Sequence, residues 1–178
     1  MLVVVGMAAL VAVLVGGARG GGRDGMTPAK VSTDPARFEL PRLGGGAPVR
    51  LADFRGEPLV ANFFASWCTA CRGEAPGFVH ASGDLRGRVQ FLGVDSMETG
   101  DGVGFARELG YGRFTLARDS GGRQDSGLHD ALGRRGLPIT AFYGSDGRLL
   151  DVATGALTEE ALRSRVADLF GVREAMHP

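Results

Sequence analysis

The alternation of apolar and polar positions changes several times between residues 37 and 171, and each change predicts a structural element. Residues 38–40 and 49–51 alternate around glycines at 44–46, which is typical of a short β-hairpin. Residues 59–64 are apolar except for Asn62, which suits a central strand buried on both faces. The remaining pattern predicts strands over 89–94, 114–117, 139–143 and 148–153, and helices from about residue 68, over 101–109, over 124–132 and over 158–170.

The last helix has the clearest pattern. Thr158 can cap its N-terminus, two glutamates follow in the first turn where the helix dipole favours negative charge, and Gly171 can end it. Strands that alternate with helices, followed by a hairpin and a covering helix, predict an α/β domain with a mixed central sheet. The apolar stripe of this helix consists of Leu162, Val166, Leu169 and Phe170.

The N-terminal segment differs from the rest of the chain. Residues 1–18 contain no charged side chain, and nine of them are leucine or valine, which predicts a membrane anchor. Small residues at 16–18 leave a cleaved secretory signal as the alternative. Residues 19–36 have no apolar period and predict a flexible linker, before a domain over 37–171 and a tail over 172–178. The formal net charge is zero, so no nucleic-acid partner is expected.

Two cysteines, Cys68 and Cys71, carry the candidate chemistry and are the only cysteines in the chain. They open a predicted helix directly after the buried strand, where unpaired N–H groups and the helix dipole favour thiolate over thiol. Since they lie one turn apart, they can form a disulfide, and we interpret the pair as redox-active. A structural disulfide and a zinc site are the alternatives. Zinc would need His80, His129 or His177, which are scattered; we interpret the first two as surface residues and expect no metal.

Longer segments around these cysteines carry a resemblance. Residues 59–76 read L-V-A-N-F-F-A-S-W-C-T-A-C-R-G-E-A-P, residues 136–142 read G-L-P-I-T-A-F, and residues 38–41 and 49–59 form the predicted hairpin. Together they resemble the TlpA/ResA-like (DsbE/CcmG-like) branch of the thioredoxin superfamily, over about residues 37–171. The resemblance implies a thioredoxin fold: a mixed central sheet flanked by helices, with an N-terminal β-hairpin extension and a central helix insertion.

The resemblance also implies roles for individual residues. Cys68 would be the attacking thiolate and Cys71 the resolving thiol. Pro138 would be the cis-proline that faces the disulfide, and Leu137 would offer its backbone groups to an extended substrate strand. Trp67, next to the first cysteine, would form part of the rim on which a substrate docks.

A proton carrier is implied as well. Glu74 lies three residues after Cys71, on the same side of the helix. In the resembled branch such a glutamate is buried near the cysteines, and burial would raise its pKa towards neutrality. The alternative is an exposed helix carboxylate. Asn62 occupies the place where ordinary thioredoxins carry a buried aspartate, which makes Glu74 the better candidate for proton transfer.

The function that follows is a thiol–disulfide oxidoreductase without a cofactor, acting outside the cytoplasmic membrane on exported proteins. With the predicted anchor it would be a single-pass membrane protein, and we expect a monomer. The resemblance implies that it reduces disulfides, for example during cytochrome c maturation. It would receive electrons from a membrane thiol donor of the CcdA/DsbD kind. If the N-terminal segment is cleaved, the protein would be secreted.

Three other functions remain open at this point. The first is a protein of the same fold that installs disulfides. The second is a peroxiredoxin, but its P-x-x-x-T/S-x-x-C motif fails, since Ala61 and Ala65 occupy the motif's proline and hydroxyl positions. The third is a copper chaperone of the Sco type, whose C-x-x-x-C spacing is one residue longer than the spacing here.

Overall fold

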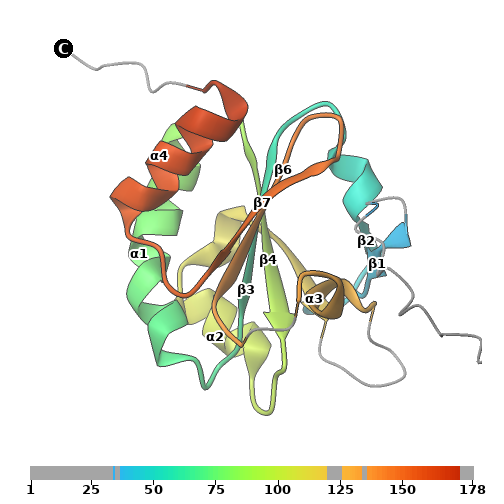
Figure 1. Ribbon diagram of the computed structural model, residues 1–178. Helices are drawn as coiled ribbons and strands as arrows, with labels where there is room; N and C mark the ends of the chain where they lie inside the picture. The colour runs from blue at the N-terminus through green and yellow to red at the C-terminus, as the bar shows by residue number, and fades with distance from the viewer. Residues whose placement is uncertain (1–33, 35–36, 120–125, 134–135, 173–178) are drawn as a thin grey trace, which may run out of the picture. The chain divides into compact units, whose positions relative to one another are not determined.

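A five-stranded mixed sheet forms the centre of the fold, with the strand order β5-β4-β3-β6-β7 (Figure 1). The computed structural model describes residue 34 and residues 37–119, 126–133 and 136–172. Strands β3, β4 and β5 run parallel, whereas β6 is antiparallel to both of its neighbours, so the predicted mixed sheet is confirmed. The bounds are Leu59–Phe64 for β3, Gln90–Ser96 for β4, Thr115–Asp119 for β5, Ile139–Tyr143 for β6 and Leu149–Thr154 for β7.

Helices and a hairpin cover the two faces of this sheet (Figure 1). On one face α1 (Thr69–Asp84) packs against α4 (Glu159–Phe170), and α2 (Gly102–Glu108) and the 3-10 helix η3 (Tyr111–Arg113) contribute to the same apolar cluster. The other face is covered by α3 (Leu128–Ala131) and by a separate two-stranded sheet. That sheet consists of β1 (Glu39–Leu40) and β2 (Val49–Arg50), and the 3-10 helix η2 (Leu51–Phe54) follows it.

Strand β3 is buried along its whole length because both faces of the sheet are covered. Its residues alternate between the two cores: Val60 and Phe64 pack towards α1, and Ala61 and Phe63 pack towards the hairpin. By the same alternation Asn62 lies on the α1 face, with no exposed surface. This explains why the strand reads as an apolar run with one polar exception.

The N-terminal hairpin lies against the edge strand β5. After β1, the Leu43 N–H donates to the Leu116 carbonyl oxygen at 3.1 Å, and the Arg118 N–H donates to the Pro41 carbonyl oxygen at 2.9 Å. An exposed strand edge offers unpaired backbone groups to other chains, and these bonds cover it. The turn between β1 and β2 uses Gly44–Gly46 with φ values of 84°, 96° and 107°, which only glycine adopts at low cost.

The predicted bounds are right for the last helix and too long for the helix before it. In α4 the Thr158 Oγ1 accepts a hydrogen bond from the Ala161 N–H at 3.1 Å, and Gly171 ends the helix at φ 67°, as predicted. The helix predicted over 124–132 begins only at Leu128, because Gly127 has a φ of 74° and cannot belong to a right-handed helix. The segments predicted as membrane anchor, linker and tail, apart from Asp34 and Val172, lie outside the described residues. Within the described residues, no helix is long and apolar enough to cross a membrane.

Candidate active site

The junction between β3 and α1 holds the two cysteines. Cys68 is the N-cap of α1, and its Sγ accepts a hydrogen bond from the Cys71 N–H at 3.1 Å. The two sulfur atoms are joined in a disulfide. Cys68 is 4% exposed and Cys71 is fully buried, so only the first cysteine borders the surface. A thiolate at Cys68 would keep the same N–H donor and the positive end of the helix dipole, both of which favour the charged form.

Glu74 lies one turn after Cys71 and is buried, as expected from the resemblance. Its Oε1 accepts from the Asn62 Nδ2 at 2.8 Å, and its Oε2 accepts from the Leu157 N–H at 2.9 Å. The Oδ1 of Asn62 in turn accepts from the Tyr111 hydroxyl at 2.9 Å. Asn62 therefore links β3 to α1 and η3, and both carboxylate oxygens of Glu74 have protein donors.

Burial dominates the titration of this carboxyl group. Loss of solvation raises the pKa of Glu74 from 4.5 to about 7, although the hydrogen bonds from Leu157 and Asn62 favour the charged form. The pKa of Tyr111 is also raised, by burial and by the nearby negative charge of Glu74. A carboxyl group with a pKa near neutrality can both release and accept a proton at physiological pH. The exposed-carboxylate alternative for Glu74 is therefore wrong.

The proline segment lies at the same edge of the sheet as the cysteines. The Leu137–Pro138 peptide bond is cis, and Pro138 is buried while Leu137 is half-buried. Since Ile139 pairs with Phe63 in the β3–β6 ladder, Pro138 falls beside the end of β3 from which the chain continues to Cys68. The topology thus brings the two predicted motifs, some seventy residues apart in sequence, to one place.

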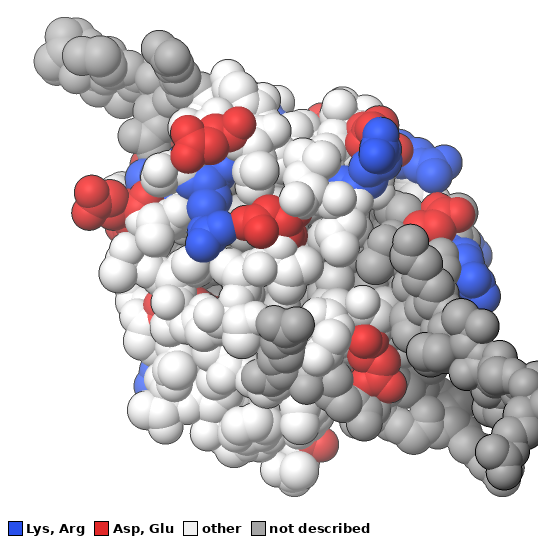
Figure 2. Space-filling model, in the orientation of Figure 1, with Lys and Arg blue, Asp and Glu red and all other residues white. Residues whose placement is uncertain are grey.

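Trp67 is the exposed part of this edge. Its side chain is 48% exposed, and its Nε1–H donates to the Met97 carbonyl oxygen at 2.9 Å. Met97 is itself 41% exposed and has a φ of 56°, which is uncommon for a residue other than glycine. Glu98 fixes this conformation, because it accepts from the Ser66 N–H at 2.7 Å and from the Ser66 hydroxyl at 2.6 Å. Figure 2 shows that the part of the surface around the start of α1 carries few charges, whereas charged side chains gather near α4 and the β6–β7 turn.

The chain is similar to known proteins over most of its length. The family model described as the AhpC/TSA family matches residues 31–143. The chain belongs to the AhpC/TSA family. Its relatives make it a thiol–disulfide oxidoreductase of the branch that includes HelX, ResA and DsbE, which confirms the resemblance seen in the sequence.

Two relatives and one solved structure illustrate the match. The oxidoreductase is 32% identical to the thiol:disulfide interchange protein HelX of Rhodobacter capsulatus, over 82% of this chain and 80% of that protein. It is 28% identical to the thiol–disulfide oxidoreductase ResA of Geobacillus thermodenitrificans, over 70% of each chain. A secreted Mycobacterium tuberculosis disulfide oxidoreductase, homologous to E. coli DsbE, matches with a TM-score of 0.63 and 25% identity, over 77% of this chain and 99% of that one. The predicted thioredoxin fold is confirmed by such neighbours.

A second buried carboxyl group was missed in the sequence. Asp95, near the end of β4, has no exposed surface and accepts from the Arg118 Nε at 3.0 Å. Burial and the neighbouring Glu98 raise the pKa of Asp95 to about 7. Although burial alone would raise it, hydrogen bonds from Ser66 and from the Gly100 backbone lower the pKa of Glu98 to about 2. The two neighbouring carboxyl groups therefore differ in protonation. Glu98 stays charged and accepts the hydrogen bonds from Ser66, whereas Asp95 binds a proton more readily.

One interpretation of a histidine was wrong. His129 was predicted at the surface, but it is only 3% exposed and lies between α3 and the sheet. Its ring stacks on Phe63, with the ring centroids 5.7 Å apart. His80 is exposed, as expected, and pairs with Glu159 and Asp84. Among the residues that the structure describes, no three His, Cys, Asp or Glu side chains are grouped so that they could hold a metal ion.

Proposed function

We propose that this oxidoreductase exchanges disulfides through Cys68 as the nucleophile and Cys71 as the resolving thiol. The observation that carries the proposal is the disulfide at the first turn of α1, where the more exposed sulfur also accepts a backbone N–H. A sulfur in this position can be attacked from solvent, whereas the second sulfur is fully buried and is reached only from the first. This asymmetry suits a two-step exchange.

The proposed reaction has two thiol–disulfide exchange steps. In the reduced protein the Cys68 thiolate attacks one sulfur of a substrate disulfide, forming a mixed disulfide and releasing the other substrate sulfur as a thiolate. The Cys71 thiol then gives its proton to the Glu74 carboxylate and attacks the Cys68 sulfur. This closes the Cys68–Cys71 disulfide and releases the second substrate thiolate, so that the substrate gains two electrons and the protein loses two. An external dithiol reverses the steps and restores the reduced protein.

Glu74 is proposed as the proton carrier because it is buried one turn from Cys71 and has a pKa raised to about 7. Trp67, Leu137 and Pro138 are proposed to bind the substrate. Trp67 offers an exposed apolar surface beside Cys68. Leu137 directly precedes the cis-proline at the start of β6, and its backbone is proposed to form hydrogen bonds with an extended substrate segment. No cofactor enters this chemistry.

The location and partners belong to the proposal too. We propose that residues 1–18 tether the protein to the cytoplasmic membrane or direct its secretion, that 19–36 act as a linker, and that 37–171 form the catalytic domain outside the membrane, followed by the tail 172–178. The similar secreted oxidoreductase of Mycobacterium tuberculosis supports an extracytoplasmic site of action. Substrates would be exported thiol proteins, with reduction during cytochrome c maturation as the specific role and a CcdA/DsbD-type thiol donor as the electron source. The domain would act as a monomer.

Two measurements on the full chain test this proposal. Cys71→Ser should trap a mixed disulfide between Cys68 and a protein substrate, whereas the matched variant Cys68→Ser should trap none. Equilibration of the wild type with glutathione buffers then gives the direction. A midpoint potential near that of thioredoxin, about −270 mV, supports reduction, and a value near −120 mV, as in a strong oxidant, would replace it by disulfide formation. Trapping at Cys71 instead of Cys68 would overturn the assigned roles.

A further inference from the structure

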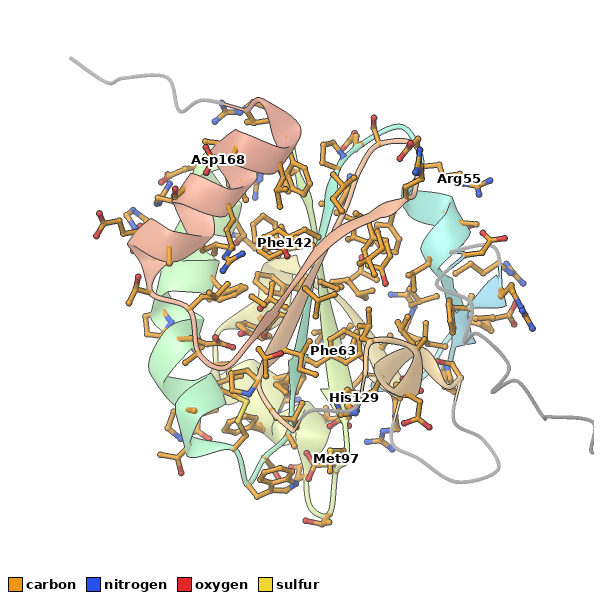
Figure 3. The ribbon with its side chains drawn as sticks, in the orientation of Figure 1. Arg55, Phe63, Met97, His129, Phe142 and Asp168 are labelled. Atoms are coloured by element: carbon orange, nitrogen blue, oxygen red, sulfur yellow. A yellow bond between two sulfur atoms is a disulfide. The ribbon has the colours of Figure 1, made fainter. Side chains whose placement is uncertain are left out.

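His129 connects Ser96, at the end of β4, to Gly136, in the segment that leads into Pro138. Figure 3 shows its side chain next to Phe63. Its Nδ1 lies 3.1 Å from the Ser96 Oγ, and its Nε2 lies 3.3 Å from the Gly136 carbonyl oxygen. The ring is buried and stacks on Phe63 with an angle of 25° between the planes. A side chain with both ring nitrogens in hydrogen bonds and one ring face against an aromatic ring has a fixed orientation.

The partners determine which ring nitrogen carries the proton. A carbonyl oxygen can only accept, so the bond to Gly136 requires a hydrogen on Nε2. In the neutral ring Nδ1 is then an acceptor, and the Ser96 hydroxyl donates to it. The histidine therefore bridges two segments: Ser96 at the end of β4 donates to Nδ1, and Nε2–H donates to the Gly136 carbonyl oxygen.

The base of this bridge is itself anchored. The Asp119 Oδ2, at the end of β5, accepts from the His129 N–H at 2.7 Å. The other oxygen, Oδ1, accepts from the Ser126 N–H and from the Ser126 hydroxyl, both at 2.9 Å. The Ser126 hydroxyl oxygen accepts from the Leu128 N–H at 3.1 Å. The buried Asp119 carboxylate thus joins the first turn of α3 to the end of β5, and this contact fixes the backbone position of His129.

The consequence concerns the peptide group between Gly136 and Leu137. A peptide unit is planar, and its C=O and N–H point in opposite directions. A hydrogen bond that fixes the Gly136 carbonyl therefore also fixes the direction of the Leu137 N–H. Gly136 has a φ of 87°, which lies outside the strand region and which most other residues avoid. The hydrogen bond from His129, and not a strand ladder, therefore orients the peptide plane between Gly136 and Leu137.

We propose that His129 is a positioning residue that orients the Leu137 N–H for an extended segment of the substrate. This inference rests on the proposed function, in which the substrate adds as a strand next to Leu137. It goes further because it assigns specificity for extended polypeptide substrates to a residue on the hairpin-covered face of the sheet. Small thiols do not form backbone hydrogen bonds with Leu137, so His129 should not affect them.

The test uses the full chain with two variants of this histidine. His129→Leu keeps the apolar bulk but cannot donate to the Gly136 carbonyl, whereas the His129→Gln amide can donate to it and accept from Ser96. Each protein is assayed for reduction of its disulfide by dithiothreitol and for steady-state exchange with insulin as the protein disulfide. We expect His129→Leu to raise KM for insulin about fivefold with kcat within about twofold, as for the loss of one oriented hydrogen bond. The rate with dithiothreitol should not change, and His129→Gln should restore most of the wild-type KM.

Three outcomes would overturn the proposal: an unchanged KM in His129→Leu, a His129→Gln protein as impaired as His129→Leu, or an equal loss with insulin and dithiothreitol. If His129→Leu does not fold, Ser96→Ala is tested instead, because it removes the hydrogen bond to Nδ1. Ser96→Ala should raise KM for insulin about twofold, and an unchanged KM would refute the proposed bridge. A wild type that reacts with dithiothreitol but never with insulin would instead refute the proposed function, and the positioning role would fall with it.

Discussion

Replacing Glu74 by glutamine should remove a pH dependence from the stability of the oxidised protein. The carboxyl group is 4% exposed, and its oxygens accept from Asn62 and Leu157. Ionisation places a charge in this buried site without a cationic partner among its hydrogen-bond donors, which is costly. Glutamine has nearly the same shape as glutamic acid, but its NH2 end can only donate, so either Asn62 or Leu157 loses its acceptor at every pH. The substitution therefore removes the ionisation, with a cost in stability that does not depend on pH.

The size of the effect follows from the shift in pKa from 4.5 to about 7, which corresponds to about 3 kcal/mol. Below pH 4.5 both the folded and the unfolded chain carry the proton, so the wild type has its full stability. Between pH 4.5 and 7 the folded protein keeps the proton that the unfolded chain releases, so stability falls as the pH rises. Above pH 7 the loss is complete and constant. Relative to the wild type, the free energy of unfolding of Glu74→Gln should thus rise by about 3 kcal/mol between pH 4.5 and pH 8.

Guanidinium chloride unfolding of the oxidised protein, followed by far-ultraviolet circular dichroism at pH 4.5 and pH 8, measures this difference. Asp95, whose pKa is also raised, titrates in both proteins and therefore cancels in the comparison. Glu160→Gln, the same chemical change on an exposed residue of α4, is the matched control. If the free energies of unfolding of Glu74→Gln and wild type differ by the same amount at both pH values, the burial argument is refuted.

The same substitution should also lower the activity. With Glu74 replaced, the Cys71 proton has no buried carboxylate to accept it, so the resolving step should slow and the pH profile of exchange should lose an inflection near pH 7. Stability that is given up at a reactive site is a common trade-off. An unchanged pH profile in Glu74→Gln would leave the carboxyl group without a role in proton transfer.

Other substitutions and reagents test separate parts of the structure. In the reduced protein Cys68 should alkylate with iodoacetamide at least about tenfold faster than Cys71, measured by peptide mass spectrometry, because only its sulfur borders the surface at a helix N-terminus; equal rates would contradict this. Leu162→Ala should lower the free energy of unfolding by about 3 kcal/mol in denaturant titrations, since Leu162 is fully buried between α4 and the sheet. Asp101→Ala should lower it by about 1 kcal/mol, because the Asp101 Oδ1 caps α2 through the Gly104 N–H at 2.8 Å.

The elements with a strong local pattern could be predicted from the sequence. The β3 strand, the β6–β7 hairpin and α4 match their predicted ranges closely, because alternation, turn residues and caps act within a few residues of each other. The α3 helix was predicted too long, since its start depends on Gly127 and not on an apolar period. Of the candidate site, the cysteines, Glu74 and Pro138 were predicted from motifs, and the structure places the cysteines and Pro138 at one edge of the sheet, whereas their roles stay predictions.

The residues that were missed share a different property. Asp95, Glu98 and His129 carry no motif, and each owes its environment to a partner at least twenty residues away in sequence: Arg118, Ser66 and Ser96. A polar residue in an apolar stretch can be recognised locally, as Asn62 was. Which side chain satisfies it depends on the strand order, which no local pattern contains. His129 was therefore misread as a surface residue, although a histidine with two partners in the core is stable there.

The strand order also explains why the end of β4 matters although it supplies no cysteine or proline. Parallel β3 and β4 end at the same edge, and antiparallel β6 begins there, so three loops meet beside the disulfide. Each neighbouring loop is bound to the residues at the end of β4: Trp67 donates to Met97, Glu98 holds Ser66, and Ser96 holds His129, which in turn holds Gly136. Substitutions at Ser66 and Ser96 act on different loops through separate contacts, so their effects on substrate exchange should add. The end of β4 thus holds the cysteine loop and the proline loop in fixed positions, although β4 itself contributes no residue to the proposed chemistry.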